Sequence, residues 1–275
     1  MISVVIPAHN EERVLKRCLE ALLEGAEPRE LEVIVVCNGC SDGTLEVARY
    51  YSDQLQILEL PHASKNDALN LGDQAASSFP RFFLDADVVC SIQTLRCLAS
   101  ALESPQILAV APLYTVSQEN CSWSVKAYYT VNNLLPLYRA GFGGAGIYGL
   151  SELGRHRFKK FHEIYADDTF IRLMFADSEW RTVRCYTEIF APKNLIDLIR
   201  IKTRSHFGGR ELREKFPNLR PYWRKNWLTL MYLALNPLLL PKVFMYVFIR
   251  LSTRIRCYFI YSKTQKKWER DESAR

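Results

Sequence analysis

The 275-residue sequence lacks the features that would place it in several broad classes of protein. Its eight cysteines are too sparse for a disulfide scaffold, and only Cys37 and Cys40 have a C-x2-C spacing. No second pair follows to complete a zinc site, so free thiols that fill small spaces are the better interpretation. The start has no basic segment ahead of a long apolar stretch, so we expect no signal peptide and a reducing, cytoplasmic setting.

A strong bias of composition is also lacking. Hydrophobic residues make up 48% and charged residues 24%, which argues against a disordered chain, a collagen-like repeat and a polytopic membrane protein. The charges are unevenly placed, however. Residues 200–275 hold 18 Lys and Arg against five Asp and Glu, whereas residues 1–199 hold 18 against 25. An acidic body with a basic, aromatic tail indicates that the two parts meet different partners.

Strands that alternate with helices are predicted for about the first ninety residues. The apolar runs at 2–6, 31–37 and 82–84 are typical of buried strands, 56–60 is a further candidate strand, and helical periodicity lies between them. This pattern predicts an α/β fold with a parallel sheet that helices cover on both faces. Such sheets bind ligands beyond the carboxyl ends of their strands, which is where the polar clusters of this sequence fall.

Asp85 and Asp87 are the clearest candidate metal ligands. They follow the apolar run Phe82–Leu84 at positions i and i+2, so both carboxylates share one face of the strand or turn together into the cleft at its end. Like charges so placed repel unless a divalent cation or a positively charged ligand holds them. Oxygen ligands favour Mg²⁺ or Mn²⁺, and Mg²⁺ takes only one or two carboxylates beside substrate phosphates. The alternative is a surface turn after a strand.

Together with other segments, this motif resembles the family-2 inverting glycosyltransferases, which have the GT-A fold. The segments in chain order are Val5–Glu12, Cys37–Thr44, Lys65–Asn70, Asp85–Asp87, Gly144–Gly146 and Asp167–Asp168. Their order and spacing agree over about residues 1–210. The resemblance therefore implies a GT-A glycosyltransferase domain over residues 1–210, with a Rossmann-like, mostly parallel sheet and helices on both faces.

The resemblance also implies a site for a nucleotide diphosphate-sugar donor. The residues after the first strand that would line its nucleoside pocket are Pro7, Ala8, Asn10 and Glu11. Asn38 stands where the family often has an Asp that reads the base. An amide both donates and accepts hydrogen bonds, so the base is left open between uracil and guanine. Asp42 would support that loop.

Further residues are implied for the diphosphate and the sugar. Lys65 would approach the nucleotide or its phosphates, Asp85 would touch the ribose or the sugar, and Asp87 would ligate the metal. Arg204 lies where many relatives carry an Arg-Trp pair on the pyrophosphate. Arg204 or His206 could bind phosphate, or both could belong to a solvated basic face.

Direct displacement of the diphosphate needs a base opposite the leaving group, to take the proton of the acceptor hydroxyl. Asp168 is the candidate, with Asp167 beside it; the family pattern there is Glu-Asp, with the Asp as base. Asp167 could instead hydrogen-bond the acceptor or hold a loop. Alternatively, one of the two carboxylates caps a helix at 169–175. The Gly-rich stretch 141–149 would meet the donor sugar and acceptor in the family, or form a flexible surface loop.

Residues 211–275 are predicted to form a helical, basic and apolar tail that associates with a membrane. The uncharged stretch 226–241 is shorter than the roughly 20 residues needed to cross a bilayer, and Pro237 and Pro241 interrupt it. Basic residues lie on both sides of it, which opposes a single crossing. A broken hairpin, or helices in the cytoplasmic interface against anionic headgroups, fits better. The alternative is a helix pair packed on the catalytic domain.

These observations predict a membrane-associated, non-processive glycosyltransferase of the hexosyltransferase type that acts in polysaccharide biosynthesis at the inner face of the membrane. It would move one sugar to a glycan or lipid-linked acceptor with Mg²⁺ or Mn²⁺. Ile201 and Ser205 replace the Gln and Trp of processive relatives.

Two other functions are less well supported. A nucleotidyltransferase usually needs a Gly-rich basic phosphate loop after the first strand, which Ala8–Glu11 is not. A non-catalytic nucleotide-sugar-binding module is opposed by the joint presence of Asp85, Asp87 and Asp168. Long apolar runs in the tail disfavour a nucleic-acid partner.

Overall fold

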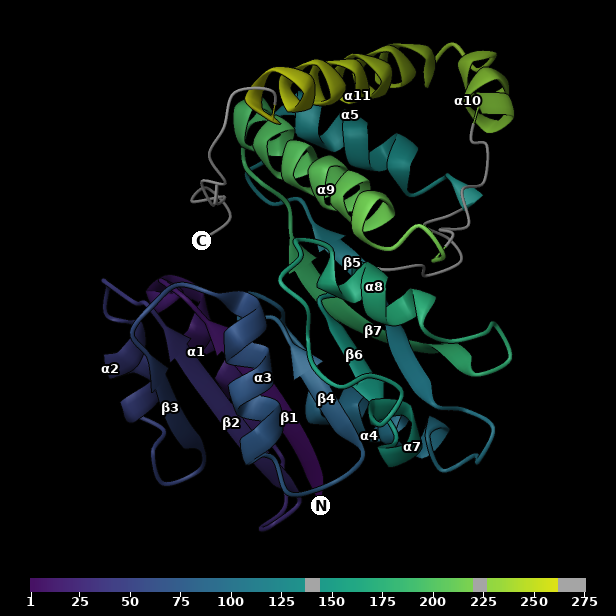
Figure 1. The fold of residues 1–275 in the computed structure, drawn as a ribbon. Coiled ribbons are helices and arrows are strands. Elements are labelled where there is room, and N and C mark those ends of the chain that lie inside the picture. Colours follow the sequence, from purple (N-terminus) through teal and green to yellow (C-terminus); the bar gives the residue numbers. More distant parts are fainter. Residues whose placement is uncertain (137–143, 220–226, 262–275) are drawn as a thin grey trace. The chain divides into compact units, whose positions relative to one another are not determined.

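The computed structural model describes residues 1–136, 144–219 and 227–261, and the chain forms two compact units (Figure 1). The first comprises Met1–Thr115, Gly143–Glu163 and Asp167–Ile189, and the second comprises Val116–Phe142, Ile164–Ala166 and Phe190–Arg275. The strands are β1 (Ile2–Ala8), β2 (Leu31–Asn38), β3 (Gln56–Leu60), β4 (Arg81–Leu84), β5 (Ala109–Ser117), β6 (Ile147–Leu150) and β7 (Trp180–Phe190). The first helices are α1 (Glu12–Leu23), α2 (Thr44–Arg49), α3 (Lys65–Ala75), α4 (Ile92–Ala101) and α5 (Trp123–Asn132). The later helices are α7 (Glu152–Arg155), α8 (Asp167–Leu173), α9 (Leu195–Lys215), α10 (Trp227–Ala234) and α11 (Leu240–Tyr261).

The strands form one sheet in the order β3-β2-β1-β4-β6-β5-β7. β1 pairs in parallel with β2 and with β4, and β2 pairs in parallel with β3. These four strands are the ones that the sequence predicts. β6 is antiparallel to both β4 and β5. The sheet is therefore parallel through the predicted half and mixed beyond β4.

Helices cover both faces of the parallel strands, and as a result every residue of β1 is buried. On one face, Val4 and Ile6 join a core with buried residues of α1 and α4, such as Leu15 and Leu95. On the other face, α3 lies so close that a Cβ atom added at Gly72 would meet Val5 Cγ1 at 2.4 Å. Uninterrupted apolar strands need this two-sided cover, so the predicted architecture is confirmed.

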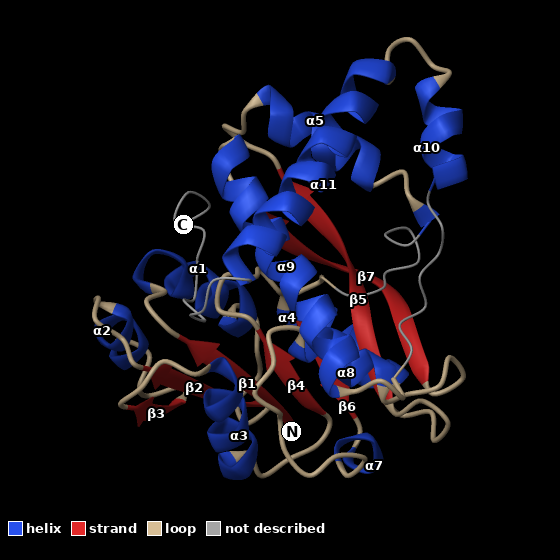
Figure 2. Ribbon diagram, turned by 45° about the horizontal axis from the view of Figure 1, so that its top comes forward, coloured by secondary structure: helices blue, strands red, loops and turns tan. Residues whose placement is uncertain are grey.

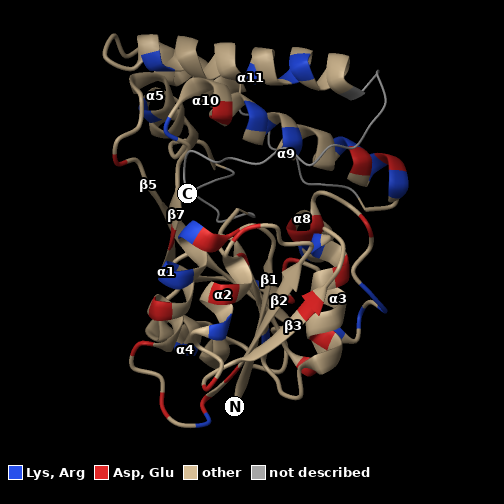
Figure 3. Ribbon diagram, turned by 90° about the vertical axis from the view of Figure 1, so that its left-hand side faces the viewer, with Lys and Arg blue, Asp and Glu red and all other residues tan. Residues whose placement is uncertain are grey.

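The second unit is built around α5, α9 and α11 (Figure 2). Tyr128 of α5 stacks on Tyr246 of α11 with ring centroids 5.0 Å apart, beside the buried Leu198 of α9. α11 carries Lys and Arg but no Asp or Glu (Figure 3). In the part of the chain that the structure describes, no helix is long and apolar enough to span a membrane. The division into domains at residue 210 stays a prediction.

Candidate functional site

The loops after β1 and β2 are tied together by side-chain hydrogen bonds at the carboxyl ends of their strands. Asn10 Oδ1 accepts from the Ser41 amide at 2.8 Å, and the Glu11 amide donates to Thr44 Oγ1 at 2.6 Å. Asp42 Oδ1 accepts from the Thr44 amide at 3.1 Å within its own loop. Asn10 adopts a left-handed conformation with φ of 52°. The predicted nucleoside residues of both loops therefore lie in one connected rim.

Asn38 extends this rim toward α3. Its side chain is 2% exposed; Nδ2 donates to the Ala8 carbonyl at 2.8 Å, and Oδ1 accepts from the Ser64 amide at 3.1 Å. Ser64 in turn caps α3 by accepting from the Asp67 amide. Pro7 precedes Ala8 in β1 and pairs in register with Val36. The Asn38 amide thus joins β1, β2 and the start of α3, while base recognition by Asn38 stays a prediction.

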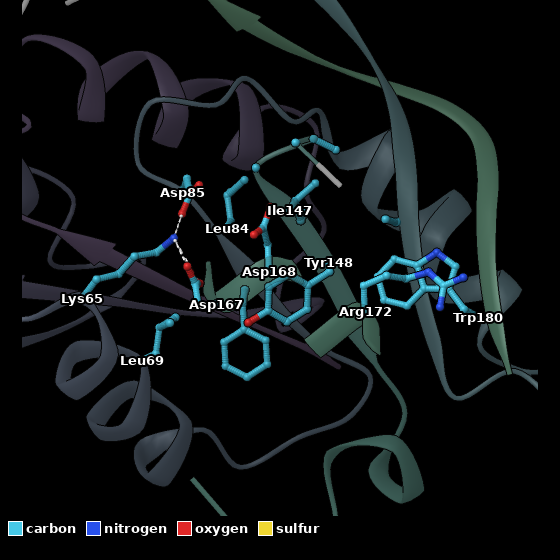
Figure 4. A pocket seen from close by; sticks show the side chains of 15 residues that line it. Lys65, Leu69, Leu84, Asp85, Ile147, Tyr148, Asp167, Asp168, Arg172 and Trp180 are labelled. Atoms are coloured by element: carbon cyan, nitrogen blue, oxygen red, sulfur yellow. Dashed lines mark hydrogen bonds and ion pairs between the residues drawn. The ribbon is translucent and has the colours of Figure 1, made fainter. Parts of the chain in front are cut away.

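A lysine between two aspartates occupies the edge of the sheet next to this rim (Figure 4). Lys65 Nζ lies 2.7 Å from Asp85 Oδ1 and 3.2 Å from Asp167 Oδ2. Lys65 is the first residue of α3, Asp85 follows β4, and Asp167 is the first residue of α8. The Asp85 amide also donates to the Gly146 carbonyl at 2.8 Å. Four separate segments of the chain therefore meet at this cluster.

Burial and charge act against each other on the two ends of the ion pair. Burial alone would lower the pKa of Lys65, but Asp167 and Asp85 outweigh it and raise that pKa. Burial raises the pKa of Asp167 to about 6, against the opposing pull of Lys65. The lysine is therefore a fixed cation, whereas Asp167 can take up a proton in mildly acidic solution.

Asp168 follows Asp167 in the first turn of α8 and is half-buried. Its Oδ1 accepts from the Thr169 amide at 2.6 Å and from Thr169 Oγ1 at 3.2 Å. A capping side chain typically accepts from the amide two or three residues ahead, so this bond to the next residue is not the usual cap. The bond fixes the orientation of the carboxylate.

These charged groups line a pocket of about 480 Å³, including the part that is open to solvent. Lys65, Asp85, Asp167 and Asp168 all contribute to its wall, as do Gly144–Gly146. Gly146 has φ of 65°, and a Cβ atom there would lie 2.2 Å from Val88 Cγ2, so glycine is required at this wall. Residues 141–143 of the predicted Gly-rich stretch lie outside the described residues.

Sequence reasoning missed three side chains that line the pocket: Tyr148, Arg172 and Trp180. The Tyr148 hydroxyl is buried, and among the described residues it has no hydrogen-bond partner. Burial, with Asp167, Asp85 and Asp168 nearby, holds the pKa of Tyr148 well above its usual value. The Arg172 guanidinium lies 5.0 Å from the Trp180 ring. Of these three residues, only Arg172 could have been found from the sequence, because it follows Asp168 by four residues and therefore shares its face of the helix.

One predicted metal ligand of the first unit does not line the pocket. Asp87 is not among the residues that line the pocket, and its carbonyl accepts from Arg17 Nη2 of α1 at 3.4 Å. Arg204 lies on α9 in the second unit, and its role stays a prediction. Within the described ranges, no group of three or more His, Cys, Asp or Glu could hold a metal ion. Asp85 and Asp87 fit a hard divalent cation only if substrate phosphates complete its ligand shell.

The sequence matches the model of the family described as Glycosyl transferase family 2 over residues 3–162, more than half of the chain. Glycosyltransferase AglE of Haloferax volcanii is 40% identical over 138 residues, which cover 48% of this chain and 45% of AglE. The dolichyl-phosphate beta-glucosyltransferase of Drosophila melanogaster is 34% identical over 99 residues, which cover 31% of this chain and 30% of that protein. The chain spans less than half the length of these curated relatives.

Solved structures resemble most of the chain. Mannosyltransferase PcManGT from Pyrobaculum calidifontis, in complex with GDP-Man and Mn²⁺, has a TM-score of 0.63 at 17% identity, and the match covers 96% of this chain and 88% of that one. Glucosyl-3-phosphoglycerate synthase from Mycobacterium tuberculosis, with Mn²⁺, UDP and glucosyl-3-phosphoglycerate, has a TM-score of 0.58 at 17% identity, covering 81% of each chain. At such identities the likeness shows the fold alone, and it confirms the predicted GT-A class.

Proposed function

The chain belongs to glycosyltransferase family 2, and from this premise we propose that it transfers one sugar from a nucleotide diphosphate-sugar to an acceptor hydroxyl with inversion. The observation that carries the proposal is the convergence of Lys65, Asp85, Asp167 and Asp168 on one pocket at the edge of the sheet. The pocket places a fixed cation and a candidate base within the same wall. Both are needed when a diphosphate leaves and a hydroxyl attacks.

The donor would lie across the rim and the pocket. Its nucleoside would occupy the loops after β1 and β2, against Asn10, Glu11 and Asp42, with Pro7, Ala8 and Asn38 beneath. Its diphosphate would lie toward Lys65, where negative charge that grows on the leaving oxygen is stabilised. The structural neighbours described above were solved with GDP-Man or with UDP, which supports a donor of this class.

A divalent cation fits the charge of the cluster. Three carboxylates, Asp85, Asp167 and Asp168, line the pocket with two cations, Lys65 and Arg172, so the wall carries one excess negative charge before any diphosphate enters. Asp87, with Asp85 beside it, would hold Mg²⁺ or Mn²⁺ together with the phosphates. When bound, that ion would neutralise the leaving diphosphate.

Asp168 is the proposed base. Its carboxylate takes the proton of the acceptor hydroxyl as the new bond forms at the anomeric carbon and the bond to the diphosphate breaks. Thr169 holds Oδ1, which orients the group for this transfer. Asp167, paired with Lys65, would position the lysine and adjoin the acceptor.

The acceptor is proposed to be a glycan or a lipid-linked molecule. One relative is named a dolichyl-phosphate beta-glucosyltransferase, and this name supports the lipid-linked class. Arg204 of α9 would meet a phosphate of the donor or the acceptor.

The experiment is an Asp168→Asn variant assayed for release of nucleoside diphosphate with a panel of nucleotide-sugars, with Mn²⁺ and after chelation. Thermal shift should show that donor binding is kept, whereas turnover should fall at least about a hundredfold, the usual contribution of a general base. Asp53→Asn is the matched control, because Asp53 is exposed in the turn after α2. Wild-type turnover in the Asp168 variant would remove this residue from the reaction, and turnover unaffected by chelation would remove the metal.

A further inference from the structure

α10 is a helix without charge that buries none of its own residues. Its sequence is WLTLMYLA, and Trp227, Met231 and Tyr232 are exposed by 54%, 60% and 74%. A helix that is hydrophobic all round is normally buried in a protein core or a membrane. Leu230, Leu233 and Ala234 pack partly on the core of the second unit. The rest of the helix is a contiguous exposed apolar face, which marks an interaction surface. The surface of α10 therefore requires an apolar partner.

α11 also has an exposed apolar side. At about 3.6 residues per turn, its buried residues Val243, Tyr246 and Ile249 lie on one side of the helix. The opposite side carries a stripe of large exposed apolar residues, and these are Phe244, Phe248, Leu251, Ile255 and Tyr258. The helix thus has two apolar faces, of which one packs on α5 and α9 and the other is open.

Two cations of α11 lie on the borders between these faces. By the same helical spacing, Arg254 lies on one border and Arg256 on the other, whereas Lys242 and Arg250 fall among the buried positions, next to Ile249 and Val243. No acidic residue balances them in this part of the sequence, because residues 216–268 hold ten Lys and Arg and no Asp or Glu. The open apolar stripe is therefore flanked by positive charge on both sides.

α9 places two further basic side chains, Lys202 and His206, near the cations of α11. Lys202 Nζ lies 5.4 Å from the ring centroids of Tyr128 and of Tyr129. Burial, with Arg250 and Arg204 nearby, lowers the pKa of Lys202 to about 8. Burial, with Arg250 and Arg254, likewise lowers the pKa of His206. The cations of α9 and α11 are thus close enough to repel one another, which an anionic surface would relieve.

We propose that α10 and α11 form an in-plane binding surface for an anionic lipid bilayer, with the open stripe at the level of the acyl chains and the flanking Arg254 and Arg256 at the headgroup phosphates. Each Lys or Arg near an anionic leaflet adds to binding, and an amphipathic helix lies in the interface rather than across it. The surface goes beyond the sugar transfer proposed above and does not depend on it. A second copy of the chain is the less favourable occupant, because pairing of two α11 helices would bring like charges together.

The test is flotation of the full chain with vesicles, without donor or acceptor. The vesicles are phosphatidylcholine alone, or an equimolar mixture with phosphatidylglycerol. The wild type should float with the anionic vesicles and about tenfold less with the neutral ones, and raising NaCl from about 0.1 M to about 0.5 M should reduce binding. No flotation with the anionic vesicles overturns the proposal.

Variants separate the two parts of the surface. Phe248→Glu with Ile255→Glu should lower binding at least about tenfold, and Arg254→Glu should lower it about tenfold on anionic vesicles alone. Leu153→Glu is the matched control, because Leu153 is 68% exposed but lies on α7 in the other unit. Equal thermal unfolding midpoints would show that the exposed positions leave the fold intact.

Insertion of α10 into the bilayer can be measured by quenching of tryptophan fluorescence. Brominated lipid should quench part of the tryptophan emission, and Trp227→Phe should remove that part if Trp227 enters the bilayer. An unchanged quench in Trp227→Phe would overturn insertion of α10. Size-exclusion chromatography gives the competing result, since a dimer that the Phe248 and Ile255 changes dissociate, with no vesicle binding, would assign the surface to a second copy.

Discussion

Lys65 is the residue on which the charge balance of the pocket depends, and its loss has a pH-dependent cost. In Lys65→Met, Asp85 and Asp167 lose their cation at pH 7.5, and we expect the free energy of unfolding to fall by about 2 kcal/mol. Breaking a fully buried pair costs about 3–5 kcal/mol, but this pair is partly open to solvent.

The sign of the pH effect follows from Asp167. Burial already raises the pKa of Asp167 to about 6, and removal of Lys65 raises it further. The folded variant therefore binds a proton that the unfolded chain does not, and it regains stability relative to the wild type as the pH falls from 7.5 to 5. Denaturant unfolding at the two pH values measures this difference.

Lys16→Met is the matched control for this prediction. Lys16 and Glu20 form an exposed pair on α1, 3.7 Å apart, whose loss should cost a few tenths of a kcal/mol at either pH. A Lys65→Met variant whose loss of stability is the same at pH 5 and pH 7.5 would contradict the coupling between Lys65 and Asp167.

Sequence reasoning named Asp85 from its place after an apolar strand, whereas Lys65, Asp167 and Asp168 were named from the resemblance to a known family. It could not identify Tyr148, whose buried hydroxyl depends on the pairing of β6 beside β4. That pairing joins segments far apart in the chain, so no local pattern records it. The positions of the charged residues could be predicted from the sequence, whereas the packing of the side chains around them could not.

At the scale of elements, α3 matters because it carries Lys65 and lies directly on the sheet. A Cβ atom at Gly72 would meet Val5 Cγ1 at 2.4 Å and Val36 Cγ2 at 3.1 Å. Gly72→Ala should therefore lower the free energy of unfolding by about 1–3 kcal/mol, since a packed interface resists an added methyl group. It should also weaken donor binding, because the first residue of α3 shifts with the helix.

A second change tests the cause. Val5→Ala removes the Cγ atom that the new methyl group would meet, so the double variant should be more stable than the sum of the two single effects allows. Denaturant unfolding of the four proteins gives the coupling energy. If the losses in free energy of unfolding are strictly additive, the methyl group added at Gly72 does not destabilise the protein through its contact with Val5.

Three of the four predicted strands have a mostly buried pattern. The runs at 2–6, 31–37 and 82–84 correspond to β1, β2 and β4, which helices cover on both faces, whereas 56–60 corresponds to β3, in which Gln56 and Glu59 are exposed. β7 was not predicted, since its sequence WRTVRCYTEIF has neither a continuous apolar run nor a strict polar–apolar alternation and includes two arginines. Its place in the sheet depends on tertiary pairing, to which a single sequence gives no access.

At the scale of the whole molecule, the chain has separate cores in its two units. The first core includes β1, β2 and α1, and the second joins α5, α9 and α11. Sequence reasoning could distinguish a basic tail by its charge. It could not recognise that α5 and α11, which are more than a hundred residues apart in the chain, share one core. The composition of a segment can be seen directly in the sequence, whereas a core is formed by segments that are far apart in it.

Separate cores predict unequal effects of a core mutation. Tyr246 is 5% exposed and stacks on Tyr128, so Tyr246→Ala should destabilise the second unit by about 3–5 kcal/mol. Hydrogen exchange should then accelerate in the amides of α5, α9 and α11 while β1 and β2 keep their protection, because local opening follows cooperative units. Tyr50→Ala, at an 82% exposed position, should change neither set. Acceleration that reaches β1 and β2 equally would show that the two units unfold as one.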